Sequence, residues 1–153
     1  MRVLANVALA CFLLLAAGAA KAEGTVQQVG QFINNGVTAE IDTYTDNAVV
    51  VAVIVFKSNG RSYTFAFDRN DWPALERLWS AAVDKHASDY VSIGSLAETG
   101  TSEKCVMLMA AGPAIRLTIA SPIDGAMSFD VAPSFATEFD AKLRDAASVT
   151  TAS

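Results

Sequence analysis

The chain has 153 residues, of which 52% are hydrophobic and 18% are charged, and its formal net charge is −5. An acidic surface repels nucleic-acid phosphates and anionic lipid head groups, so the charge argues against both as ligands. The length suits one domain that buries enough apolar surface to be stable without cross-links.

The segment 1–22 has the three parts of a secretory signal. Arg2 gives a charged start, Val7–Ala20 is an apolar stretch, and Ala20-Lys21-Ala22 supplies small residues before a cleavage site. The apolar stretch is shorter than the roughly 20 residues of a membrane span, although an uncleaved anchor is the alternative. We therefore expect cleavage before Glu23 and a periplasmic or secreted protein without a stable membrane anchor.

Cleavage would leave the mature chain 23–153. It would remove Arg2 and Lys21 but no acidic residue, so that nine basic and sixteen acidic side chains remain and the formal charge becomes −7. It would also remove Cys11, so that Cys105 alone remains and no internal disulfide can form. Cys105 is expected to be buried as a small apolar residue, or alternatively to join two chains through an intermolecular disulfide.

Two strands are predicted at the start of the mature chain. Residues 25–33 have a weak apolar pattern, and Asn34-Asn35-Gly36 is a hairpin turn signal. Residues 37–44 then alternate between apolar and polar side chains, which is typical of a strand with one buried and one solvent-exposed face. Asp46-Asn47 is expected to turn the chain into the next strand.

The central stretch is the β-branched run from Ala48 to Lys57, which predicts a strand buried on both faces. Asn59-Gly60 favours a two-residue type I′ hairpin in which Ser58 faces Arg61. This register places one apolar row of the run opposite an aromatic row of the following strand: Phe56 opposite Tyr63, Ile54 opposite Phe65, and Ala52 opposite Phe67.

A helix is expected next, with Asp71 as its N-cap, Pro73 in its first turn and an end near His86. Its apolar stripe has helical spacing. The stripe comprises Trp72, Leu75, Leu78, Trp79, Ala82 and Val83.

The second half repeats this order. Polar residues 98–103 and the turn Pro122-Ile123-Asp124-Gly125 separate its strands. The predicted strands span 90–97, 104–111, 114–121 and 126–131, the helix spans 134–147, and residues 148–153 are expected to be a disordered tail.

The predicted fold is α+β, with two consecutive antiparallel ββββα units at about 25–86 and 90–147 and one helix covering each sheet. Phe67-Asp68 and Phe129-Asp130 precede the two helices and are expected to mark equivalent positions of the two units. This element order resembles the tandem strand-and-helix layout of Whirly-type and Pur-type nucleic-acid-binding proteins. The resemblance implies a nucleic-acid ligand and a basic stripe across the sheet, which the acidic charge argues against.

Three residues are weak catalytic candidates. Asp68 and Asp130 stand where strands give way to helices and could work as an acid and base pair, or could simply accept backbone N–H groups there. His86 is the single histidine and is more typical of packing at a helix end than of a general base, because Gly94-Ser95 is too little to form a nucleophile motif.

Other chemistry has little support in the sequence. No cofactor or metal motif is present. Trp72 and Trp79 have core spacing, and Lys57, Arg61 and Arg69 could form a small basic spot or a solvated strand edge.

The favoured hypothesis is a non-enzymatic module that binds a protein, a peptide or a small apolar ligand, with a homodimer also possible. The alternative is a small hydrolase with a carboxylate site between the two halves.

Overall fold

The computed structural model describes residues 24–46, 49–98 and 105–151. The expected signal segment and most of the polar loop at 98–103 therefore lie outside the described residues. The elements are β1 (Thr25–Asn34), β2 (Val37–Asp46), β3 (Val49–Ser58), β4 (Arg61–Phe67), α2 (Trp72–Asp84), β5 (Val91–Ala97), β6 (Val106–Ala111), β7 (Ile115–Ser121), β8 (Gly125–Val131), the short 3₁₀ helix η1 (Pro133–Phe135) and α3 (Ala136–Thr151).

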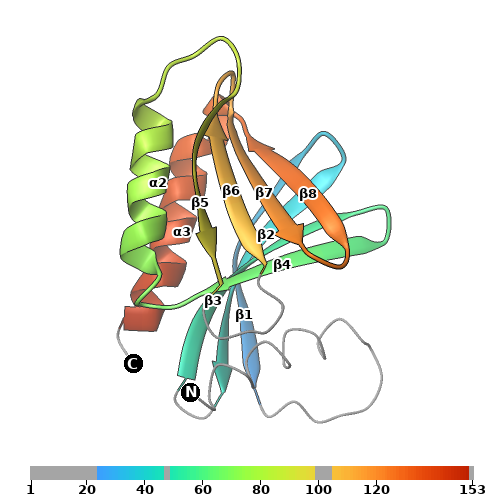
Figure 1. Cartoon of the computed structure of the whole chain (residues 1–153). Coiled ribbons are helices and arrows are strands. Elements are labelled where there is room, and N and C mark those ends of the chain that lie inside the picture. Colours follow the sequence, from blue (N-terminus) through green and yellow to red (C-terminus); the bar gives the residue numbers. More distant parts are fainter. Residues whose placement is uncertain (1–23, 47–48, 99–104, 152–153) are drawn as a thin grey trace.

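The strands form two antiparallel sheets, each in sequence order (Figure 1). Sheet 1 contains β1-β2-β3-β4 and sheet 2 contains β5-β6-β7-β8, and one helix follows each sheet in the chain. The predicted pair of ββββα units is confirmed.

Local turn chemistry sets the registers of the first hairpins. Asn59 and Gly60 have φ angles of 50° and 73°, and Asn35 and Gly36 have 51° and 77°, which is the left-handed backbone that a type I′ turn requires. Ser58 consequently pairs with Arg61, and the predicted apolar row of β3 lies opposite the aromatic row of β4.

The two helices are exchanged between the halves, which the order of elements does not reveal. Although α2 follows sheet 1, it contacts β5 and β6 of sheet 2, and α3 contacts β1, β2 and β3 of sheet 1. Gly94 allows this approach, because a Cβ atom there would lie 2.6 Å from Cδ2 of Leu78. Each sheet is thus covered by one helix, as predicted, but by the helix of the other half.

One core lies between the sheets and the helices and draws on both halves. Trp79 of α2 is only 2% exposed and stacks on Phe139 of α3, with ring centroids 5.4 Å apart. Phe139 also contacts Phe32 of β1 and Phe129 of β8. The helices lie side by side on one flank of the molecule (Figure 1).

β3 is buried on both faces, as its sequence predicts. Ala52, Ile54 and Phe56 belong to the main core, whereas Val51, Val53 and Val55 form a second cluster with Tyr44. All members of this second cluster come from β2 and β3, and Ala66 of β4 packs against it.

Two predicted helix ends were wrong. α2 ends at Asp84, so His86 lies beyond it, and Val83 is 48% exposed rather than part of the buried stripe. α3 continues to Thr151 because Ala147 and Thr150 extend its buried stripe, and the Thr150 hydroxyl donates to the carbonyl of Ala147 at 2.7 Å. Residues 148–151 are therefore helical and not a disordered tail.

The predicted alignment of the two units was also wrong. Asp68 follows the end of β4, whereas Asp130 lies within β8, so the two are not equivalent. The alignment that matches the helix starts, Trp72 with Ala136, also matches the buried positions of the helices. It pairs Leu75 with Phe139, Trp79 with Leu143, and Ala82 with Ala146.

Candidate functional site

Asp68 closes the turn that leads into α2. Its Oδ1 atom accepts hydrogen bonds from the backbone N–H groups of Asn70 (2.7 Å) and Asp71 (3.2 Å), and its carbonyl oxygen accepts from the N–H of Trp72 (3.1 Å). The carboxylate is used locally, as an Asx-turn requires.

Asp130 is bound by Arg116, which lies directly opposite it on β7. Arg116 Nε donates to Oδ1 at 2.7 Å and a terminal nitrogen donates to Oδ2 at 2.8 Å, while the ring of Tyr90 stacks 3.9 Å from the guanidinium carbon. The bond from Arg116 lowers the pKa of Asp130, although burial opposes this. An acid held ionised in this way is poorly suited to donate a proton.

The candidate carboxylates therefore belong to separate local networks. Asp68 follows the last strand of sheet 1, whereas Asp130 lies in sheet 2, and each is engaged by its own neighbours. His86 is exposed in the connection between α2 and β5, so the expected packing at a helix end is not found.

Cys105 precedes β6 and is half-buried against the main core. It forms no disulfide within the described part of the chain, and its carbonyl oxygen accepts from the N–H of Glu98 at 3.0 Å. This placement agrees with the expected apolar role. The alternative of an intermolecular disulfide stays a prediction.

The tryptophans and the basic side chains do not form a site. Trp79 is part of the core, and Trp72 stacks on Phe67 with ring centroids 6.2 Å apart. Lys57 is paired with Glu40, and Arg61 donates to the carbonyl of Asp124 in the β7–β8 loop at 2.9 Å. The basic residues of the central hairpin thus have separate partners.

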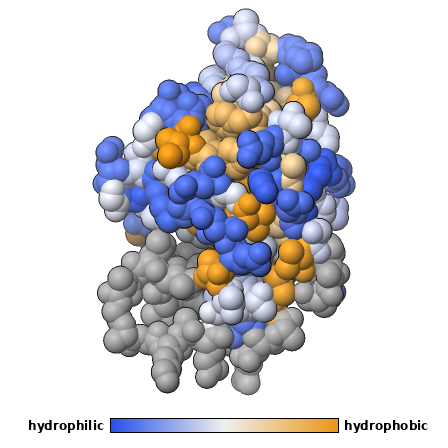
Figure 2. Space-filling model, turned by 180° about the vertical axis from the view of Figure 1, so that it is seen from behind, coloured by the Kyte–Doolittle hydropathy of each residue, from blue (hydrophilic) through white to orange (hydrophobic). Residues whose placement is uncertain are grey.

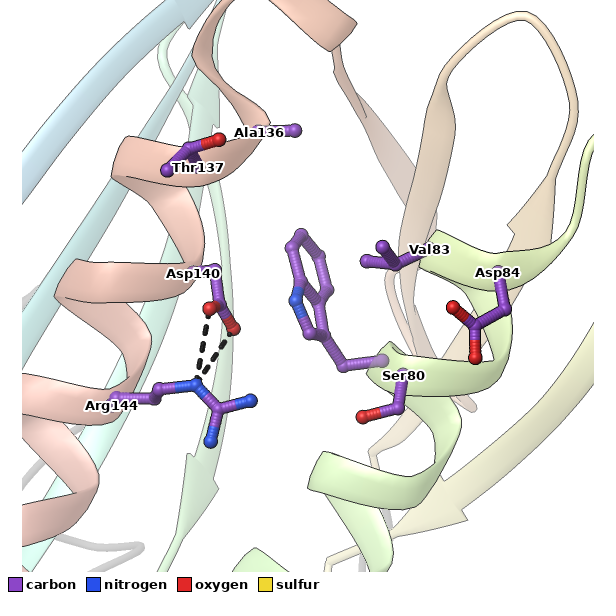
Figure 3. A pocket seen from close by; sticks show the side chains of 8 residues that line it. Ser80, Val83, Asp84, Ala136, Thr137, Asp140 and Arg144 are labelled. Carbon is purple, nitrogen blue, oxygen red and sulfur yellow. Dashed lines mark hydrogen bonds and ion pairs between the residues drawn. The ribbon is translucent and has the colours of Figure 1, made fainter.

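A groove of about 330 Å³ runs between α2 and α3 (Figure 3). Its charged lining residues are Asp84, Asp140 and Arg144, and Arg144 bonds to Asp140 (3.1 Å) and to Glu76 of α2 outside the groove lining (2.5 Å). Trp79 forms one wall but is almost fully buried in the core. The groove therefore lies along the contact between the two helices, which the ion pair between Arg144 of α3 and Glu76 of α2 joins.

Glu98 is a partly buried carboxyl that the sequence did not single out. Its Oε1 atom accepts from the backbone N–H of Ala66 at 2.6 Å, which joins the end of β5 to the outer edge of β4. Burial raises the pKa of Glu98 from 4.5 to about 7, the hydrogen bond from Ala66 opposes this, and the charge of Asp71 adds to it.

This pKa gives a prediction for stability. The folded pKa lies above the unfolded one, so the native state binds the proton more tightly and stability falls as pH rises between 4.5 and about 7. Glu98→Gln keeps the oxygen that accepts from Ala66 but removes the charge. We expect it to raise the free energy of unfolding by about 1–3 kcal/mol at about pH 8, with little change near pH 4.

Urea unfolding of both proteins across this pH range measures the effect. Glu138→Gln, at an exposed position on α3, is the matched control and should change the slope of the profile less than Glu98→Gln does. A Glu98→Gln profile that keeps the slope of the unaltered protein would contradict the prediction.

Asp42 is a second carboxyl with a raised pKa, on the outer face of sheet 1. It pairs with Val53 across the strands, and its Oδ1 atom is buried with no hydrogen-bond partner among the described residues. Burial, helped by the charge of Glu40 and opposed by that of Lys57, raises its pKa from 3.8 to about 6. Asp42 therefore gains a proton more readily than an exposed aspartate.

Sheet 2 has one buried face and one face turned to solvent, which we call the open face. Its centre is Leu108, which is 44% exposed, and its two charged residues, Arg116 and Asp130, neutralise each other. Its other side chains are small or uncharged. The open face comprises Ser92, Ser95, Ala97, Val106, Leu108, Ala110, Arg116, Thr118, Ala120, Ala126, Ser128 and Asp130.

Polar side chains of the open face pair with one another at two places, Arg116 with Asp130 and Thr118 with Ser128. Thr118 and Ser128 satisfy each other through a hydrogen bond of 2.7 Å between their hydroxyls. On the rear of the molecule, by comparison, hydrophobic side chains lie in separate groups among hydrophilic ones (Figure 2). The open face is thus a neutral platform on an acidic protein.

Comparisons with known proteins do not assign the chain. No protein-family model matches it, and no curated protein matches its sequence. Within 24–46, 49–98 and 105–151, no group of three or more His, Cys, Asp or Glu side chains could hold a metal ion. None of the helices described is both long enough and apolar enough to cross a membrane.

Proposed function

We propose that the protein is an exported, non-enzymatic module that binds another protein across the open face of sheet 2. The observation that carries this proposal is the open face itself: none of the described helices covers it, small side chains surround the exposed Leu108, and its charges balance. Small side chains allow a partner protein to come close to this face. Because the face has no net charge, it does not repel an acidic partner as the rest of the acidic surface would.

The shape of the face favours a protein over a small molecule. Small-molecule sites are concave and enclose the ligand, whereas the open face is a sheet surface. Because its side chains are mostly alanine, serine and threonine, the partner has to supply the larger apolar side chains that fill the space between them. Leu108 then acts as the central anchor of the interface.

Export is supported by the sequence of residues 1–22 alone. Mass spectrometry of the N-terminus of the protein recovered from the periplasm or the medium tests it, with Glu23 as the expected first residue. An intact Met1 in exported material would contradict this part of the proposal.

Binding is tested by affinity capture with the exported protein and two variants. Leu108→Glu places a charge at the centre of the open face, and Val83→Glu is the matched control because Val83 is an equally exposed residue of α2. We expect a protein captured by the unaltered chain and by the control to be lost, by about tenfold or more in affinity, with Leu108→Glu. Equal capture by all three would refute the role of the open face.

A further inference from the structure

We propose that, in the uncleaved chain, the segment 1–22 lies on the outer face of sheet 1 and covers its apolar cluster. This cluster consists of Tyr44, Val51, Val53 and Val55, and its members are only 2–8% exposed. An antiparallel sheet face without a cover leaves its side chains open to water. Burial this complete therefore requires another segment above the cluster.

None of the described elements supplies that cover. The described residues of the cluster, and the two that pack against it, Val49 and Ala66, all belong to sheet 1. α3 packs on the inner face of sheet 1, with the main core, and α2 packs on sheet 2. The cover therefore comes from residues outside 24–46, 49–98 and 105–151.

Three of the four stretches outside these ranges are too short or too polar for this task. Residues 47–48 connect β2 to β3, and two residues reach at most about 7 Å, whereas the cluster extends about 13 Å along β3. Residues 99–104, TGTSEK, are polar, and residues 152–153 are two residues that follow α3. The segment 1–22 remains.

The segment 1–22 fits the face in its point of attachment, length and composition. The described chain begins at Gly24, which lies so close to Tyr44 that an added Cβ atom would collide with the phenol ring. The apolar stretch 7–20 would span about 21 Å even at the rise of a helix, which exceeds the length of the cluster. Alanine and leucine make up most of this stretch, and they gain stability by burial against valines.

The segment and the face also carry opposite charges. The segment contains Arg2 and Lys21 and no acidic residue, whereas the outer face carries Glu40, Asp42 and Asp46. Glu40 already has a basic partner on β3. The Oδ1 atoms of Asp42 and Asp46, however, are buried and have no hydrogen-bond partner among the described residues. Because β1 begins opposite the end of β2, Lys21 can reach the carboxylate of Asp46.

The segment contains its own probe, Cys11, within the apolar stretch. In the uncleaved chain with Cys105→Ala, we expect Val53→Cys to form an intramolecular disulfide with Cys11 on air oxidation. Val83→Cys is the matched control, because Val83 is an exposed valine on α2, which packs on sheet 2. It should form about tenfold less disulfide, since a tethered thiol has a high effective concentration only where its tether lies. No disulfide with Val53→Cys, or equal amounts in the two variants, would overturn the inference.

Cleavage before Glu23 should then uncover the cluster. The chain 23–153 should bind more of an apolar fluorescent dye than the uncleaved chain does. Val53→Lys should remove most of this difference, and it should keep the fold because the new charge lies opposite Asp42. Val83→Lys should leave the difference unchanged, with circular dichroism confirming the fold of each variant.

Equal dye binding by the cleaved and uncleaved chains would also contradict the inference, because it would mean that the segment covers nothing. The cross-link is measured in the uncleaved chain. Its outcome is therefore independent of the export and the partner binding in the proposed function.

Discussion

Trp79→Ala is expected to lower the free energy of unfolding by about 3–5 kcal/mol, the range for truncating a buried aromatic residue. Trp79 is 2% exposed and stacks on Phe139, which in turn contacts β1 and β8. The cavity left by the indole would therefore lie where both helices and both sheets meet, and no single element could move to fill it.

Urea denaturation followed by circular dichroism measures this loss. Because the core is one cluster, the variant should unfold in one transition at a lower urea concentration, without an intermediate in which one half stays folded. Trp72→Ala is the control, since Trp72 is only partly buried at the start of α2, and it should cost less, about 1–2 kcal/mol. Equal losses for the two variants would contradict the central position assigned to Trp79.

Cutting the chain between Ala87 and Ser88 is expected to leave neither half able to fold as a monomer. In fragment 23–87 the inner face of sheet 1 would lack α3, and in fragment 88–153 the inner face of sheet 2 would lack α2. Each fragment would then expose a row of large apolar side chains to water, a loss that a chain of this size cannot absorb. For sheet 1 the row includes Ile54, Phe56 and Phe65.

Expressing the fragments alone and together tests the exchange of helices. Each alone should be unfolded or associated with itself, and the two together should form a soluble 1:1 complex with the circular dichroism spectrum of the intact chain. The intact protein nicked at the same connection, which is largely exposed at His86 and Ser88, is the control and should keep its fold. A folded, monomeric fragment 23–87 would show that sheet 1 is stable without α3.

The element order and the hairpin registers were predictable because they depend on local chemistry. Asn59-Gly60 accepts left-handed backbone at both positions, and this alone fixes which residues of β3 and β4 face each other. The pairing of Arg116 with Asp130 was not accessible in the same way. The predicted four-residue turn 122–125 would place Arg116 opposite Val131, whereas Gly125 already belongs to β8 and pairs with Ser121, which places Arg116 opposite Asp130.

The exchange of helices and the raised pKa of Glu98 were not predictable. Both sheets present similar apolar inner faces, so the sequence cannot say which helix covers which sheet. Glu98 follows a short strand in a polar stretch and is partly buried only because the end of β5 reaches the edge of β4. Such contacts between segments distant in sequence leave no periodic pattern behind. The predicted alignment of the units failed for a related reason, since Phe-Asp occurs at non-equivalent positions in the two halves.

The crossover of the helices also has a consequence for synthesis. A growing chain makes β1, β2 and β3 early, whereas α3, the helix that covers them, is made after all the other described elements. The apolar inner face of sheet 1 therefore stays exposed while residues 59–135 are being synthesised. Nascent forms of this protein should therefore bind chaperones that recognise exposed apolar segments, and release should follow only once α3 has left the ribosome.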